Sequence, residues 1–147
     1  MNYSECIIKA KDRIGKFCKA CPECNGRACK NQMPGPGSKG IGDTAVRNYD
    51  KWKEIRVQMD TIAENKPVDT SLKLFGKTFC YPVFAGPVGA VSLHYGDCLD
   101  DVAYNDILVS ACAENGIAAF TGDGVDSNVM VAATAAIKKT GGVGIPT

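Results

Sequence analysis

Short apolar runs that alternate with amphipathic stretches constrain the fold of this chain more than any other feature. The runs are YPVFAGP (81–87), IAAFTG (117–122) and VGIP (143–146). The stretches between them have helical character over 100–115 and 126–140, and glycine follows each one. Strand starts ~25 to 35 residues apart are typical of parallel βα units. The second half of the chain therefore predicts a β-α-β-α-β segment of an α/β fold.

The three apolar runs do not alternate between polar and apolar residues. Parallel strands that are covered on both faces have this composition, so we expect interior strands of a parallel sheet. The run at 143–146 leaves an edge whose backbone groups have no partner within the 147 residues. We expect a longer polypeptide or another chain to supply that partner.

The first 69 residues have a different character. Residues 1–17 predict a short amphipathic helix, residues 18–42 carry four cysteines and a stretch rich in Pro and Gly, and residues 44–59 predict a second helix. Trp52 is predicted to anchor that helix in the core. We assign residues 1–69 to an N-terminal cap with a Cys-rich segment.

Residues 70–147 form the second predicted region. At its start, apolar residues recur at every second position on both sides of Gly76-Lys77. This alternation predicts a small β-hairpin with its turn at these two residues. The parallel βα units follow the hairpin.

Composition limits the classes of partner. Hydrophobic residues make up 45% and charged residues 22%, and 17 basic residues against 16 acidic ones leave a formal charge of +1 without a basic stripe. Nucleic acid is therefore not an expected partner. No apolar run approaches the ~18 residues of a membrane span, and the N-terminus lacks the pattern of a signal peptide. We expect a cytoplasmic protein without a membrane partner.

Small residues follow the first two parallel strands. Ligands bind at the carboxyl ends of such strands, where loops open and helix N-termini point. A flat ligand can approach a backbone closely where side chains are small. The alternative is that the glycines only make tight turns between strand and loop. The predicted cofactor-binding residues are Gly86, Pro87, Val88, Gly89, Thr121 and Gly122.

Four cysteines follow the spacing C-x2-C-x2-C-x4-C. Cys18, Cys21, Cys24 and Cys29 can wrap a tetrahedral zinc ion or an iron–sulfur cluster at this spacing. Free thiols are the main alternative, and disulfides are less favoured in a reducing compartment. The remaining cysteines after the cap, Cys80, Cys98 and Cys112, are predicted to be small core residues.

A family resemblance rests on several motifs together. YPVFAGPVGAVSLHYGD followed by IAAFTGDG is similar to the first two barrel strands of the FMN-dependent α-hydroxy-acid oxidases and dehydrogenases, which include glycolate oxidase and lactate oxidase. RNYDKWKEIRVQM (47–59) resembles the segment before the barrel. The CxxCPxCNGxAC and PGxGxKG signatures resemble a clostridial-type branch of α-hydroxy-acid oxidising proteins.

The resemblance implies a partial (β/α)8 TIM barrel, made of the first three βα units, with an N-terminal Cys-rich helical cap. It implies FMN as cofactor, with the backbone of the first strand and its loop against the flavin ring, and a homo-oligomer for the full-length enzyme. Pro82, Val83, Gly86, Pro87, Val88 and Gly89 match the family's first-strand motif.

The family's catalytic His, its substrate-binding Arg and its flavin-stabilising Lys lie on late barrel segments that have no match here. We therefore assign no catalytic residue, and His94 matches a scaffold histidine of the family. The implied function is oxidation of a small 2-hydroxy acid to the 2-oxo acid, by a protein of which this chain is an N-terminal part and inactive alone. The alternative is a small four-cysteine metal or iron–sulfur module for electron transfer or binding on an α/β scaffold.

Overall fold

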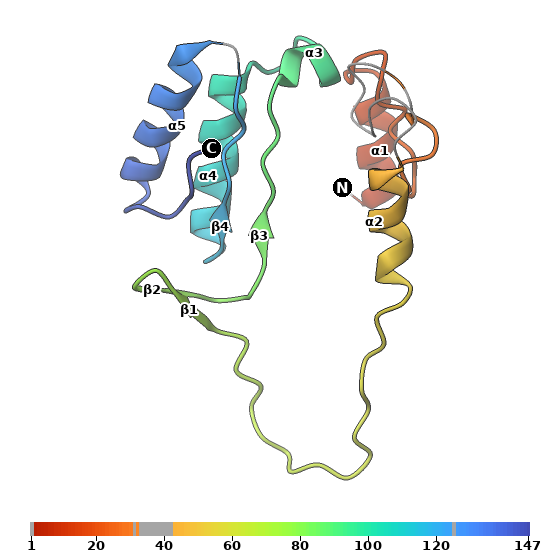
Figure 1. The fold of residues 1–147 in the computed structure, drawn as a ribbon, viewed down its shortest axis with the longest axis vertical. Coiled ribbons are helices and arrows are strands. Elements are labelled where there is room, and N and C mark those ends of the chain that lie inside the picture. Colours follow the sequence, from red (N-terminus) through yellow and green to blue (C-terminus); the bar gives the residue numbers. More distant parts are fainter. Residues whose placement is uncertain (1, 31, 33–42, 125) are drawn as a thin grey trace. The chain divides into compact units, whose positions relative to one another are not determined.

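The computed structural model describes residues 2–30, 32, 43–124 and 126–147 (Figure 1). The backbone divides into two compact units. Residues 1–64 and 92–98 form the first, and residues 65–91 and 99–147 form the second. The assignment of 1–69 to a cap and 70–147 to a barrel segment stays a prediction.

The second unit contains a short parallel sheet covered by helices. Strand β3 (Phe84–Ala85) pairs in parallel with β4 (Ala118–Ala119), and Phe120 forms a parallel bridge with Ile145. The order and direction confirm an α/β arrangement, although the strands are shorter than predicted. The described residues form no closed barrel.

Helix α4 (Asp101–Glu114) and helix α5 (Ser127–Lys139) lie next to each other in this unit (Figure 1). Each begins at an aspartate whose side chain accepts a backbone N–H: Asp100 from Ala103 at 2.7 Å, and Asp126 from Asn128 at 2.8 Å. Both helices have the predicted extent, because these caps and the glycines behind the helices are local signals. The core between them and the sheet contains Val109, Cys112, Ala119 and Ala136.

A hairpin of β1 (Leu72–Leu74) and β2 (Lys77–Phe79) precedes the sheet, as predicted. Its two-residue turn is Phe75-Gly76, not Gly76-Lys77, since Leu74 pairs with Lys77. The hairpin is tied to the rest of the unit in two places. Phe79 packs edge-to-face on Phe84 with ring centroids 5.5 Å apart, and Nζ of Lys77 donates to the Gly141 carbonyl at 2.6 Å.

The first unit contains helix α1 (Tyr3–Lys11), helix α2 (Thr44–Trp52) and most of the short helix α3 (Val91–Tyr95). Asn2 and Glu5 form a capping box at the start of α1. The sequence analysis did not predict α3. The described part of the Cys-rich segment, residues 18–30 and 32, contains no helix or strand, and the Pro- and Gly-rich stretch at 33–42 lies outside the described residues.

Two expectations for the second predicted helix are wrong. It ends at Trp52 rather than at residue 59, and Trp52 is 74% exposed rather than anchored in a core. The apolar residues that suggested a longer helix are not packed in the structure: Ile55 is 62% and Val57 88% exposed. A helical turn without tertiary packing is unstable in water, so the helix stops where its contacts stop.

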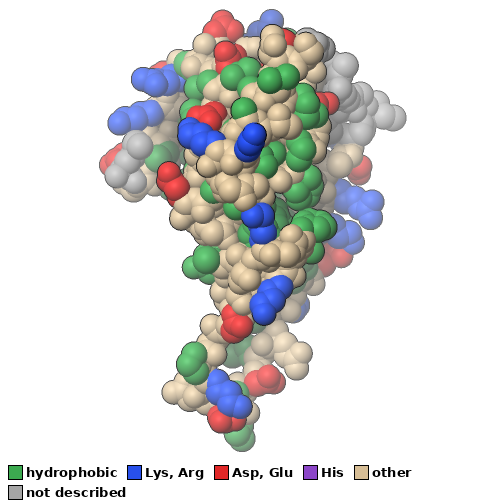
Figure 2. Space-filling view, turned by 90° about the vertical axis from the view of Figure 1, so that its left-hand side faces the viewer, with side chains coloured by type: hydrophobic (Ala, Val, Ile, Leu, Met, Phe, Trp, Pro, Cys, Tyr) green, Lys and Arg blue, Asp and Glu red, His purple; other side chains and the backbone are tan. Residues whose placement is uncertain are grey.

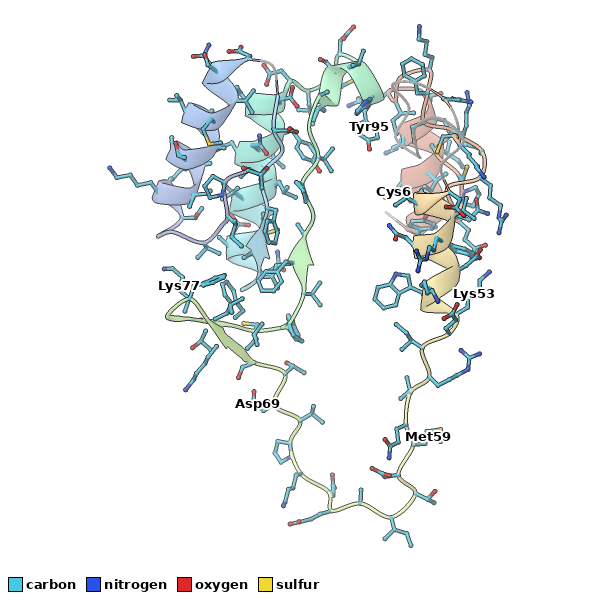
Figure 3. All side chains as sticks on the ribbon, in the orientation of Figure 1. Cys6, Lys53, Met59, Asp69, Lys77 and Tyr95 are labelled. Atoms are coloured by element: carbon cyan, nitrogen blue, oxygen red, sulfur yellow. The ribbon has the colours of Figure 1, made fainter. Side chains whose placement is uncertain are left out.

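An extended segment then continues to the hairpin. Met59 and Asp69 mark it in Figure 3, and Ile62 and Val68 on the same segment are also exposed. On the face drawn in Figure 2, Lys and Arg side chains lie among Asp and Glu side chains rather than in a patch of one sign. None of the helices in the described ranges has the length and apolar character needed to cross a membrane.

The hairpin turn generates a stability prediction. Phe75 and Gly76 both have positive φ, +52° and +73°, a combination that strongly favours Asn-Gly. A phenylalanine in this conformation costs about 1 kcal/mol, so Phe75→Asn should raise the free energy of unfolding by roughly that amount in urea denaturation. Gly76→Ala should shift it in the opposite direction, although its Cβ would meet no atom within 4 Å. A destabilised Phe75→Asn chain would contradict this account.

Candidate functional site

The carboxyl ends of the parallel strands meet at one edge of the second unit. The N–H of Phe120 donates to the Ala85 carbonyl at 2.9 Å, and the N–H of Thr121 donates to the Ile145 carbonyl at 3.0 Å. Gly86 and Thr121 therefore leave their strands at the same edge. We call this the carboxyl edge, and it consists of residues 86–89, 121–124 and 147.

Two of the predicted glycines hold the loops of this edge together. A Cβ on Gly122 would lie 1.8 Å from the carbonyl oxygen of Val88, and one on Gly89 would lie 2.2 Å from the carbonyl oxygen of Asp123. No side chain fits into either contact. Contact between the two loops is therefore enough to require glycine at Gly89 and Gly122, without any ligand. This agrees with the alternative that the sequence left open, in which these glycines have only a structural role.

Gly86 has a different environment. A Cβ at this position would meet no atom within 4 Å, and both Gly86 and Pro87 are exposed. Packing therefore does not explain the glycine. It leaves bare backbone at the carboxyl edge, with space beside it that a side chain at residue 86 would fill.

Thr121 is fully buried. Its hydroxyl accepts the Thr147 N–H at 3.3 Å, and the Thr147 hydroxyl donates to the Thr121 carbonyl. The side chain is thus directed into the packed edge. Contact between Thr121 and a ligand stays a prediction.

Sequence reasoning missed a residue that fixes this edge. Asn105 on α4 is fully buried, and its side chain pairs with both backbone groups of Gly122. Its Oδ1 accepts the Gly122 N–H at 3.0 Å, and its Nδ2 donates to the Gly122 carbonyl at 3.4 Å. The available signal was an amide on the same helical stripe as the buried Val109 and Cys112.

Asp101, at the start of the same helix, holds the other loop. Its Oδ1 accepts the Val91 N–H at 2.9 Å. One helix therefore positions the chain after β3 through Asp101 and the chain after β4 through Asn105. A bent loop whose backbone groups are satisfied in this way is pre-organised for a ligand.

A cavity of ≈ 260 Å³ opens beside the carboxyl edge. It is smaller than the roughly 300 Å³ at which small-molecule pockets begin, so it accommodates part of a cofactor rather than a whole one. Two carboxylates in its wall oppose a phosphate group. Its lining residues are Asp123, Gly124, Asp126, Ser127, Val129, Met130 and Thr147.

His94 lies on α3 in the first unit, half-buried. Its ring packs edge-to-face on Tyr95 with the centroids 6.1 Å apart. This environment suits the scaffold role expected for it.

The predicted metal ligands gather around a second cavity, of ≈ 400 Å³. Cys18, Cys24 and Cys29 line it. Burial, and then the thiols of Cys24 and Cys18, raise the pKa of Cys29. All eight cysteines are free thiols, and the described residues contain no group of three or more Cys, His, Asp or Glu side chains placed to hold a metal ion. Metal binding stays a prediction.

The other cysteines divide as follows. Cys112 is buried, which confirms its predicted place in the core. Cys80 and Cys98 are exposed, so the same prediction is wrong for them. Neither lies on the face of a helix or strand that packs on the core.

The fold and the edge together define an α/β protein with a candidate ligand surface at the carboxyl ends of parallel strands. A family model described as FMN-dependent dehydrogenase matches residues 36–141, more than two thirds of the chain. This chain belongs to the FMN-dependent dehydrogenase family, as its motifs suggested. The family consists of oxidoreductases that bind FMN. No curated protein and no solved structure gives a match.

The carboxyl edge fits one part of FMN. Gly86, followed by the exposed Pro87, leaves room for an isoalloxazine ring to approach the backbone, because a Cβ at Gly86 would meet no atom within 4 Å. The acidic wall of the neighbouring cavity does not suit the phosphate. The described residues therefore offer a surface for the ring and none, at this edge, for the phosphate.

Asn105 provides a test of the edge. Asn105→Ala leaves the Gly122 N–H buried without an acceptor, which should lower the free energy of unfolding by about 1 to 3 kcal/mol. The matched control is Asn128→Ala on exposed α5 surface, where the change should stay within about 0.5 kcal/mol. Urea denaturation followed by circular dichroism measures both. Equal effects would show that Asn105 does not support the loop.

Proposed function

We propose that this chain supplies the flavin-ring wall of an enzyme that oxidises a small 2-hydroxy acid to the 2-oxo acid. In this proposal the parallel βα units belong to a (β/α)8 TIM barrel, and the residues before them form a cap. The observation that carries it is the bare backbone at Gly86, at the carboxyl edge of parallel strands, in a chain of the FMN-dependent dehydrogenase family.

The residues of the edge have separate tasks in this proposal. Residues 86–89 contact one face of the ring, Asp101 and Asn105 hold the two loops in place, and Gly89 and Gly122 let those loops touch. Bound FMN supplies the redox chemistry by accepting hydride equivalents. Rigid backbone against the ring fixes its position and excludes water from that face.

The 2-hydroxy acid is proposed from the resemblance of the first-strand motif to the α-hydroxy-acid oxidases. We assign no proton-abstracting residue within this chain, so the base belongs to another part of the enzyme. The same resemblance supports a homo-oligomer for the full-length enzyme, and we propose that this enzyme is cytoplasmic. The four-cysteine electron-transfer module is not favoured as the main function, because the family match at 36–141 excludes all four of its cysteines.

The flavin wall is tested by changing Gly86. Gly86→Val adds a side chain into open space, so the free energy of unfolding should change little, while the dissociation constant for FMN should rise by about tenfold or more. FMN binding is measured by quenching of flavin fluorescence, and stability by urea denaturation.

Gly122→Ala is the contrasting variant. Its Cβ would lie 1.8 Å from the Val88 oxygen, so it should lower stability by about 1 to 3 kcal/mol whether or not FMN is present. Unchanged FMN affinity in Gly86→Val, or an unmodified chain that fails to bind FMN, would refute the wall.

A further test concerns turnover. The isolated 147-residue chain, mixed with FMN and with glycolate or lactate, should not bleach the flavin absorption under anaerobic conditions, because no residue in it is assigned as the base. Photoreduction of the same sample controls for a competent flavin. Substrate-dependent bleaching by the pure chain would overturn the assignment of the base to another part.

A further inference from the structure

The Cys-rich segment has no task in the proposed flavin chemistry. Cys18 to Cys29 lie before the residues that match the family, which begin at 36. They belong to the first compact unit, whereas the carboxyl edge belongs to the second. Four cysteines within twelve residues therefore need an explanation of their own.

Three of these four cysteines line one cavity. Cys18, Cys24 and Cys29 line the ≈ 400 Å³ cavity, whose wall also includes Asn48 and Tyr49 of α2. Cys21 lies on the same loop, between Cys18 and Cys24.

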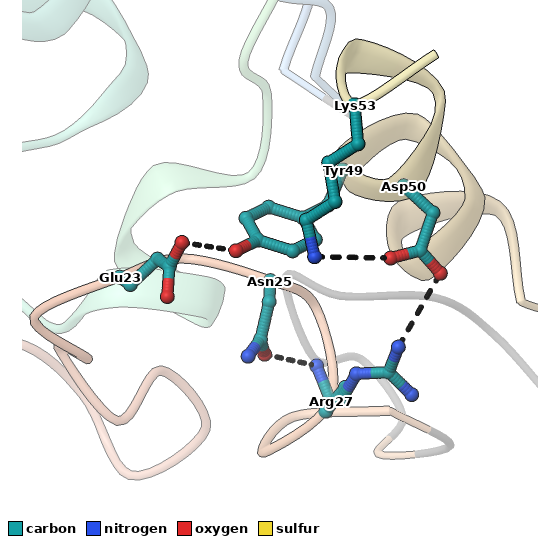
Figure 4. A network of polar contacts seen from close by, with 6 residues as sticks. All are labelled: Glu23, Asn25, Arg27, Tyr49, Asp50 and Lys53. Atoms are coloured by element: carbon teal, nitrogen blue, oxygen red, sulfur yellow. Dashed lines mark hydrogen bonds and ion pairs between the residues drawn. The ribbon is translucent and has the colours of Figure 1, made fainter.

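The loop that carries them is fastened to both neighbouring helices. Tyr3 on α1 donates its hydroxyl to the Pro22 carbonyl at 2.8 Å. Figure 4 shows the contacts to α2: Tyr49 donates to the carboxylate of Glu23, and Arg27 pairs with Asp50 at 3.3 Å. These contacts are exposed and individually weak, but together they set where the loop lies.

The backbone of the loop is also specialised. Gly26 has a φ of +71°, and a Cβ there would lie 2.7 Å from the Cβ of Ala45, so only glycine lets the loop approach α2. Ala20, directly before Cys21, is buried with a φ of +44°. A non-glycine residue adopts this conformation at a cost of about 1 kcal/mol, and such residues cluster at ligand sites.

The charges around the cysteines suit a bound metal. A divalent ion held by four thiolates has a net charge of about −2. Residues 15–30 contain four basic side chains and one acidic one, which compensates that charge locally. The basic residues are Lys16, Lys19, Arg27 and Lys30, and the acidic residue is Glu23.

We propose that Cys18, Cys21, Cys24 and Cys29 bind a thiophilic metal as a four-thiolate centre that fastens the cap. The described residues contain no group of three or more Cys, His, Asp or Glu side chains placed to hold a metal ion, so the loop has to rearrange around the ion when it binds. The loop has no helix or strand over these residues that such a rearrangement would break. Four thiols and one divalent ion give the tetrathiolate complex and four protons, which pass to the solvent.

The experiment uses the whole chain, purified under reducing, anaerobic conditions without chelator. Elemental analysis should find about one zinc or iron ion per chain without acid-labile sulfide, since the centre holds a single ion. Iron with a comparable amount of acid-labile sulfide would show a cluster and overturn the single-ion centre. FMN binding is measured on the same sample, so that failure of the metal site and failure of the flavin wall are separate results.

Variants locate the site. Cys24→Ser and Cys29→Ser should each lower metal affinity by about tenfold or more, while Cys6→Ser and Cys98→Ser, outside the cluster, should leave it unchanged. If a ligand variant does not fold, a titration of the unmodified chain with Co²⁺ tests the site instead. Titration with Co²⁺ should produce the intense thiolate-to-cobalt absorption of a tetrahedral four-sulfur site.

Three further results would overturn the proposal. The first is a chain that takes up neither zinc nor iron and gives no thiolate-to-cobalt absorption. The second is metal that remains bound after both ligand variants are combined. The third is disulfide pairing among these cysteines in a glutathione buffer at the redox potential of the cytosol. Mass spectrometry after alkylation of the free thiols detects it.

Discussion

The packing of α4 on the parallel strands is the constraint on which the second unit depends. Val109 and Ala119 are completely buried at this contact, and Asn105 is buried in the same stripe. The apolar contacts fix the helix against the sheet. The side-chain amide of Asn105 then holds the loop after β4 in place. Its two hydrogen bonds to Gly122 form only when the helix lies at one position along the sheet.

Much of this unit follows from local signals in the sequence. Asp100 and Asp126 cap helices that begin where expected, and the apolar runs predicted parallel strands. The hairpin was also predicted, but its turn was placed one residue late. Phenylalanine at a positive φ contradicts its own propensity, so residue preferences directed the turn toward Gly76-Lys77.

Features that depend on distant partners could not be predicted in the same way. The role of Asn105 depends on its hydrogen bonds to Gly122, which lies 17 residues later in the sequence. The second helix was predicted to be too long, because the spacing of Ile55 and Val57 does not show whether these side chains have a surface to pack against. At the carboxyl edge, the sequence could not separate Gly86, which faces open space, from Gly89 and Gly122, which face backbone. Only the three-dimensional structure distinguishes a glycine beside open space from a glycine required by contact with another loop.

The contact between the loops at Gly89 and Gly122 has a consequence for how such a protein can diversify. Each glycine is required by the backbone of the opposite loop, so neither loop can gain a side chain or an inserted residue there unless the other moves with it. A substitution at either glycine therefore requires a compensating movement of the opposite loop. Variation that alters what the enzyme accepts has to arise on segments that are not interlocked in this way.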